Sequence, residues 1–445
     1  VWWQHSWQNA LITEGKLVGC VDVSESEVFQ SKSWIKGFKE IALVMFNLDL
    51  WFTQNEDQFI KVCWAAFLSR QQLIKERRIP VAILFSENPD LGMPVLQKME
   101  KFLDTMQVGG NRYVITYNAI FATNDEGGIP LASRDSEMSR KRWDTLFPEA
   151  KRGPGDTGHL RGLFWNSYWW SLLEPQYQNK TLCKPESTFL PLSKRPKPFL
   201  ALGGDSQPFR ALVLMQLHNK GYLNSSLWSL QTPLLCCMRN AIDCSSENHP
   251  PHARPQWQAI DKVLGNKMDS FCPMFPKKLD IALDGSTADS DKDRTFPPQS
   301  LYDQTRFSIV FESIIVSSDL MFLTEKVLKP LHRGHPYLLL CASKHSHALI
   351  KSFGFETFQA VIDESYDASS QFSTCHLDAN NPQKFAKTVD DAVQTIVKLA
   401  RKDPKEWDKL NLVVQKNQRH MHCGGFRRNM MSHATAILEL MLAAQ

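Results

Sequence analysis

Three consecutive residues, Thr324, Glu325 and Lys326, offer the side chains that a phosphorylated ligand requires. Thr324 is a good helix N-cap, which would place Glu325 and Lys326 in the first turn of a helix. Free backbone N–H groups and the positive end of the helix dipole favour an anion there. Lys326 would bind phosphate, and Glu325 could accept hydrogen bonds from two hydroxyls of a ribose. An ordinary N-cap followed by a solvated Glu-Lys pair is the alternative, because three residues alone are a weak signal.

The surrounding stretch reads as a strand, a helix and a second strand, which is the order of a parallel βαβ unit. Residues 307–311 form an apolar run long enough for a buried strand, and the run ends at Glu312. Apolar residues recur at helical spacing after Lys326, and residues 337–341 form the second run. Ligands of α/β folds bind beyond the carboxyl ends of parallel strands, so the pattern predicts that Glu312 lies near a ligand.

Another strand-loop-helix element precedes this unit in the chain. Residues 199–202 are expected to form a strand, residues 203–208 a loop, and Arg210 is expected to start a helix. A glycine-rich turn lets the backbone approach a phosphate closely, and the guanidinium of Arg210 could hold that phosphate through two hydrogen bonds. The alternative is a surface arginine, although a cation in a first helical turn opposes the helix dipole unless an anion is bound.

These motifs resemble the donor-binding signature of the α-1,3-fucosyltransferases, in which FEN or FES precedes TEK and a strand that carries a proline. The likeness is closer still to fucosyltransferase-like GT-B proteins of phages, large viruses, bacteria and algae. Those proteins carry TEK-x-x-KP, GHP, GF-x-TF and DESYD in this order, here at residues 324–330, 334–336, 354–358 and 363–367. The chain departs from the fucosyltransferase pattern at Ser313, where that family has asparagine, and in a longer gap between Glu312 and Thr324.

The resemblance implies an α/β protein of the GT-B class, with two Rossmann-like domains facing each other across a cleft and a C-terminal helical tail. It implies a donor site in the second domain, made of Ser206, Arg210, Glu312, Thr324, Glu325 and Lys326. The expected donor is a nucleotide-diphosphate sugar, with GDP-fucose as the family default, and the expected acceptor is a hydroxyl of a glycan or glycoprotein. Transfer would invert the anomeric carbon without an obligatory metal, although Mn²⁺ could stimulate it.

Glu87 is the candidate catalytic base. It follows the apolar run 81–85 in the sequence FSENP, which resembles the segment that carries the proposed general base of the fucosyltransferases. A carboxylate near the acceptor hydroxyl could take its proton as the glycosidic bond forms. A strand-ending turn, which Asn88 and Pro89 favour in any protein, is the alternative.

Composition limits the partners of the chain. A net charge of +4 over 445 residues argues against a protein that coats nucleic acid and permits a local basic pocket. No apolar run approaches the roughly 18 residues of a membrane-spanning helix, so membrane attachment would need an upstream segment. Acceptor sequons at Asn179 and Asn224 and cysteines without paired zinc spacing favour the secretory-pathway lumen, in particular the Golgi. A cytoplasmic location is the alternative for a viral or bacterial protein.

We expect three parts: an acceptor domain at 1–190, a donor domain at 191–425 and a C-terminal helix at 426–445 that could pack back on the first domain. Strands are expected within 40–52, at 81–85 and at 113–117, a strand-like pair at Val361 and Ile362, and helix throughout 404–443. His345 and His347 could bind a metal but lack partners at a fixed spacing, so a capping or surface role is favoured. A non-catalytic glycan- or nucleotide-sugar-binding protein with the same fold is the alternative function, and a structural protein is a third.

Overall fold

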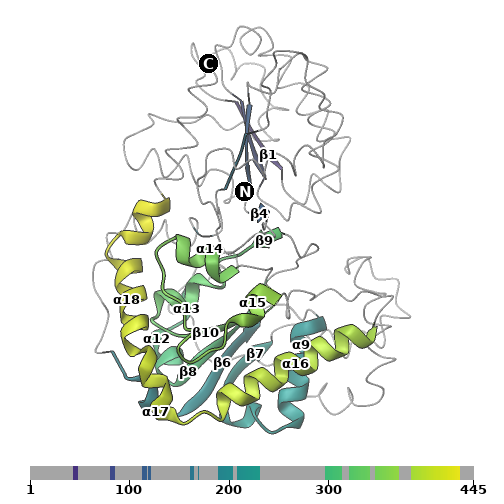
Figure 1. The fold of residues 1–445 in the computed structure, drawn as a ribbon, viewed down its shortest axis with the longest axis vertical. Helices are drawn as coiled ribbons and strands as arrows, with labels where there is room; N and C mark the ends of the chain where they lie inside the picture. Colours follow the sequence, from purple (N-terminus) through teal and green to yellow (C-terminus); the bar gives the residue numbers. More distant parts are fainter. Residues whose placement is uncertain are drawn as a thin grey trace, which may run out of the picture. The chain divides into compact units, whose positions relative to one another are not determined.

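A computed structural model of the chain describes strand positions 44–48, 81–85, 113–117, 119–121 and 161–164, and residue 169. It also describes residues 189–203, 208–230, 296–312, 320–340, 346–369 and 382–430. The chain divides into two compact units, residues 1–179 with 426–445 and residues 180–425 (Figure 1). The predicted domain boundaries at 190 and 425 stay predictions. In the described part of the chain, no helix combines the length and apolar character that crossing a bilayer requires.

A four-stranded parallel sheet forms the centre of the unit at 180–425, in the order β10-β8-β6-β7. Its strands are β6 (Lys197–Gly203), β7 (Leu227–Leu230), β8 (Thr305–Phe311) and β10 (Tyr337–Leu340). Every residue of β8 and β10 is buried, as expected of strands that are covered on both faces. The chain runs from β6 outward to β7, then returns to the other side of β6 for β8 and β10. The strand order therefore reverses between β6 and β8, which the register pairs at Leu200 and Ser308.

Helices cover this sheet because their apolar faces need a partner. α9 (Pro208–Asn219) and α16 (Pro382–Ala400) lie against each other (Figure 1), joined by an edge-on contact of Phe209 with Phe385 at 6.0 Å. Phe307 of β8 stacks on Trp407 of α17 (Pro404–Trp407), with ring centroids 5.0 Å apart. α12 (Gln299–Asp303) precedes β8, α13 (Leu328–His332) precedes β10, and α14 (Ser346–Ser352) and α15 (Ser365–Ser369) follow it. This part of the chain is an α/β structure, as predicted.

One predicted helix is interrupted and one predicted strand is wrong. In its described part, the helix expected at 404–443 consists of α17, a 3-10 turn at Asp408–Leu410, α18 (Asn411–His422) and further helical residues at 425–430. Gly424 then turns the chain with a φ of 80°, a conformation that glycine adopts readily. Val361 and Ile362 lie in a turn and not in a strand, and the N–H groups of both donate to the carbonyl of Phe358. Their apolar character reflects burial, since they are 6% and 0% exposed.

The unit formed by 1–179 and 426–445 contains a second parallel sheet, in the order β1-β2-β3-β5. Its strands are β1 (Val44–Leu48), β2 (Val81–Phe85), β3 (Tyr113–Tyr117) and β5 (Arg161–Phe164); the short strands β4 (Ala119–Phe121) and β9 (Leu320–Phe322) lie outside the two sheets. The strands predicted at 81–85 and 113–117 have these bounds, and β1 lies within the predicted 40–52. Within the same unit, the buried rings of Trp169 and Phe426 lie 5.7 Å apart.

Candidate functional site

Glu312 lies directly after β8, at the carboxyl end that the sequence predicted. Its N–H donates to the carbonyl of Leu340 at 2.9 Å, so the ladder between β8 and β10 continues to this residue. Its side chain is 0% exposed and accepts two hydrogen bonds from Thr324, at 3.1 Å from the backbone N–H and at 2.7 Å from the hydroxyl. Thr324 lies twelve positions further along the chain, and this pair brings it to the end of β8.

The segment from Thr324 to Lys326 forms a turn rather than the predicted first helical turn. α13 begins at Leu328 with Val327 as its N-cap, and no side chain caps it. Thr324 is therefore not the helix N-cap, because its hydroxyl donates to Glu312 and caps the turn instead. The Thr324 Oγ1 accepts a hydrogen bond from the Lys326 N–H at 3.4 Å and lies 3.5 Å from the Lys326 Nζ.

Glu325 is nearly buried and is part of an ion pair. It is 8% exposed, and its Oε1 lies 3.9 Å from the Nζ of Lys329, one helical turn further on. Its carbonyl accepts hydrogen bonds from the N–H groups of Leu328 and Lys329, at 3.1 and 3.3 Å. The predicted contact of Glu325 with a ribose stays a prediction, and Lys329 is a neighbour that sequence reasoning did not connect with it.

Arg210 lies in the first turn of α9, which begins two residues earlier than predicted. The side chain is 3% exposed, and its Cζ lies 5.6 Å from the ring centroid of Phe311. A Cβ added to Gly203, the last residue of β6, would lie 2.9 Å from the Arg210 Cδ. The guanidinium is thus held between the carboxyl ends of β6 and β8. Sequence reasoning named Arg210 but missed the roles of Gly203 and Phe311.

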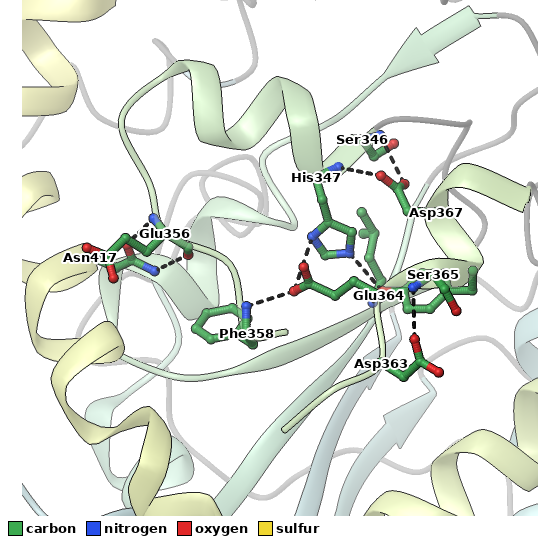
Figure 2. Close-up of polar contacts among 11 residues, drawn as sticks. Ser346, His347, Glu356, Phe358, Asp363, Glu364, Ser365, Asp367 and Asn417 are labelled. Atoms are coloured by element: carbon green, nitrogen blue, oxygen red, sulfur yellow. Dashed lines mark hydrogen bonds and ion pairs between the residues drawn. The ribbon is translucent and has the colours of Figure 1, made fainter. Parts of the chain in front are cut away.

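The DESYD segment forms a second polar cluster with α14, in which Tyr366 and His347 are buried and Asp363 and Ser365 are exposed (Figure 2). Asp363 accepts a hydrogen bond from the Ser365 N–H at 3.1 Å and so caps α15, and Glu364 accepts one from the Phe358 N–H at 2.7 Å. Asp367 accepts hydrogen bonds from the N–H groups of Ser346 and His347, both at 3.0 Å, and so caps α14 (Figure 2). The segment therefore joins three parts of the chain around the end of β10.

His347 lies at the centre of this cluster and is 4% exposed. The hydroxyl of Tyr366 accepts a hydrogen bond from the Leu339 N–H at 3.2 Å and forms a second hydrogen bond with the His347 Nε2, 2.8 Å away. The Nδ1 faces the carboxylate of Glu364 at 3.7 Å (Figure 2). The favoured capping or surface role is wrong for His347, because it is buried and its own N–H is one of the two that Asp367 caps.

Burial dominates the electrostatics of the cluster. It lowers the pKa of His347 to about 3, with a smaller effect of the positive Lys351, and so keeps the imidazole neutral. Burial also raises the pKa of Asp367 to about 7, against the pull of the two N–H donors from His347 and Ser346. The pKa of Glu364 is raised for the same reason, opposed by its hydrogen bond from Phe358. The contacts of this cluster are those of a structural joint between α14, α15 and β10.

Several predicted residues lie outside the described part of the chain. These are the candidate base Glu87, the loop residue Ser206 and the histidine at 345. In the part that is described, no group of three or more His, Cys, Asp or Glu side chains is arranged to hold a metal ion.

Comparison of the chain with protein-family models, with curated proteins and with solved structures gives no match.

Proposed function

We propose that the chain is a GT-B glycosyltransferase that moves a sugar from a nucleotide-diphosphate donor to a hydroxyl of a glycan or glycoprotein. The observation that carries this proposal is the position of two cationic side chains. Arg210 lies over Phe311, and the turn that carries Lys326 is tied to Glu312, the next residue. Both therefore lie at the carboxyl ends of β6 and β8, where the strand order reverses and where α/β sheets bind their ligands.

The chemistry of the two cations suits a diphosphate. The guanidinium of Arg210 can hold two phosphate oxygens at once, and the ammonium of Lys326 adds a mobile point charge. Together they would stabilise the negative charge that develops on the leaving nucleotide diphosphate, which is where electrostatic catalysis acts. Glu325 would accept hydrogen bonds from the ribose, and Glu87 would take the proton of the acceptor hydroxyl as the bond forms with inversion. GDP-fucose is the first donor to test, and the reaction would not require a metal.

The first experiment is a thermal-shift screen of the chain against GDP, UDP, CDP and ADP and their common sugar conjugates, with and without Mn²⁺. A ligand that binds the folded state raises the melting temperature, so one nucleotide should do so. Lys326→Ala should then weaken binding of that nucleotide by about 10- to 100-fold, as expected for loss of a charge-assisted hydrogen bond. Lys416→Ala is the matched control, because Lys416 forms an exposed pair with Glu356.

Two outcomes would contradict the proposal. If no nucleotide raises the melting temperature of folded protein, the chain has no donor site. If a nucleotide binds but Lys326→Ala and Lys416→Ala bind it equally well, the site lies elsewhere. Release of free nucleotide from the matching sugar conjugate, measured with mixed glycan acceptors, separates an enzyme from a protein that only binds.

A further inference from the structure

We propose that Glu312 is a positioning residue that acts on Lys326 through Thr324 and does not itself contact the ligand. This inference rests on the proposed function, because it concerns the same nucleotide site. It replaces the simpler expectation that a carboxylate at the carboxyl end of β8 binds the donor directly. The contacts of Glu312 lead to this conclusion in three steps.

The first step is that both carboxylate oxygens of Glu312 bind Thr324. Oε1 accepts from the backbone N–H at 3.1 Å and Oε2 accepts from the hydroxyl at 2.7 Å. Glu312 is 0% exposed and Thr324 is 3% exposed, so water does not compete for these bonds. Hydrogen bonds to an ionised acceptor are among the strongest in proteins, and here two of them join the same pair of residues.

The second step is that Glu312 sets the direction of the Thr324 hydroxyl. A hydroxyl has one proton and two acceptor lone pairs, and the proton of Thr324 points to Glu312. Its lone pairs then face Lys326, whose N–H lies 3.4 Å and whose Nζ lies 3.5 Å from the Oγ1. Glu312 thus fixes both the turn that carries Lys326 and the acceptor beside the ammonium group.

The third step concerns charge. A diphosphate is an anion, and a carboxylate placed against it would be repelled. The carboxylate of Glu312 instead bonds Thr324, and Thr324 contacts Lys326. Glu312 can therefore position the ammonium group of Lys326 without contacting the diphosphate. Glu312 therefore contributes to the site most effectively where the structure places it, with Thr324 between its carboxylate and Lys326.

The test is a pair of double-mutant cycles on the full chain, with GDP binding measured by titration calorimetry. Glu312→Gln replaces one acceptor oxygen by a donor at the same volume, and Thr324→Val removes the hydroxyl but keeps the shape. Each should weaken GDP binding about tenfold, which is about 1.4 kcal/mol. The double variant should be no more than about threefold weaker than either single variant, because coupled residues are not additive. Thr324→Ser keeps the hydroxyl and should stay within about threefold of the unmodified chain.

The second cycle combines Glu312→Gln with Lys326→Ala. If Glu312 acts through Lys326, then in the Lys326→Ala background the Glu312→Gln substitution should weaken GDP binding by less than about a further twofold. A general structural defect would still weaken binding in that background, so this readout separates positioning from stability. Glu356→Gln, an exposed glutamate paired with Lys416, is the matched control and should leave GDP affinity unchanged.

Each result decides between the two proposals. Additive losses in either cycle, or unchanged affinity in Glu312→Gln, would overturn the positioning role while the nucleotide site itself survives. Absence of GDP, UDP, CDP and ADP binding by the unmodified chain would overturn the proposed function, and with it this inference. Unfolding in urea gives a readout without ligand, in which Glu312→Gln and Thr324→Val must lower stability non-additively if the two side chains are bonded as described.

Discussion

Tyr366→Phe is the sharpest test of the cluster around His347, because it removes one oxygen atom and leaves the ring in place. Tyr366 is 6% exposed, and its hydroxyl contacts the Leu339 N–H at 3.2 Å and the His347 Nε2 at 2.8 Å. β10 is an edge strand among the described strands. The carbonyls of Pro336 and Leu340 accept hydrogen bonds from the N–H groups of Ser308 and Glu312. The Leu339 N–H therefore points away from the sheet, since direction alternates along a strand.

The magnitude follows from the two groups that the substitution leaves buried. A polar atom that loses its partner in the interior costs about 1–3 kcal/mol. The Leu339 N–H is one such atom. The His347 Nε2 is the other. Without the Tyr366 hydroxyl, Nε2 loses its donor if it is unprotonated, and it loses its acceptor if it carries the ring proton. We expect a loss of about 2–4 kcal/mol in the free energy of unfolding of the unit at 180–425, after some rearrangement.

The assay is urea unfolding followed by circular dichroism, with hydrogen exchange of the peptide that contains β10 as the local readout. Tyr222→Phe is the matched control, because the Tyr222 hydroxyl bonds the exposed Arg401. Its loss should change stability by less than about 0.5 kcal/mol, as for other exposed substitutions. If Tyr366→Phe is no more destabilising than Tyr222→Phe, and exchange at Leu339 is unchanged, the reasoning about the buried hydroxyl is refuted.

Two further predictions concern pH and a glycine. Burial lowers the pKa of His347 from 6.5 to about 3, so its contribution to stability is lost as pH falls below 6.5. Burial raises the pKa of Asp367 from 3.8 to about 7, so its contribution is lost as pH rises from 3.8. Each group changes the free energy of unfolding by about 1.4 kcal/mol per pH unit in its window. As pH falls from 7 to 4, His347→Gln, which keeps Asp367, should gain stability in urea unfolding. Asp367→Asn, which keeps His347, should lose stability over the same range. Equal slopes in both variants would contradict this. Gly203→Ala would bring a methyl group to 2.9 Å from both the Arg210 Cδ and the Leu230 Cδ1 and to 3.1 Å from the Ser229 carbonyl oxygen. It should cost about 1–3 kcal/mol and, by displacing Arg210, weaken GDP binding several-fold in calorimetry. Gly221→Ala, with a φ of 77° and nothing described within 4 Å, should cost about 1 kcal/mol and leave GDP affinity unchanged, and equal affinities in the two variants would count against the site.

Strands with continuous apolar runs could be predicted from sequence, including the short β10, whereas β5 and β7 could not. β2, β3 and β8 are runs of five to seven residues rich in Val, Ile, Phe and Tyr, which favour strands. β5 and β7 have only four residues each, RGLF and LWSL, and such short runs carry no recognisable period. They become strands because a parallel neighbour pairs with them along their length. The pairing of β5 with β3 and of β7 with β6 joins segments far apart in the chain, and the residue pattern within each short segment does not reveal it.

The candidate site was predictable in its residue types but not in its contacts. The glycine-rich turn between a strand and a helix singled out Arg210, and the Thr-Glu-Lys sequence singled out Lys326. Nothing local indicated that Phe311 lies beneath Arg210, since the two are joined only through the pairing of β6 with β8. Nor did the acidic DESYD segment indicate that Asp367 caps α14, because the two capped N–H groups belong to residues 20 and 21 positions earlier.

The gap between Glu312 and Thr324 is longer than in the fucosyltransferase pattern, and hydrogen bonds between these two residues close it. Closing a flexible loop costs only about 0.6 kcal/mol more for each doubling of its length. The hydrogen bonds that close this one are made to a charged acceptor, and such bonds contribute about 1.5–3 kcal/mol each. Two of them, at 3.1 and 2.7 Å in a buried site, outweigh the small cost of a longer separation in sequence. The position of Lys326 therefore depends on the bond between Glu312 and Thr324 and not on the number of residues between them.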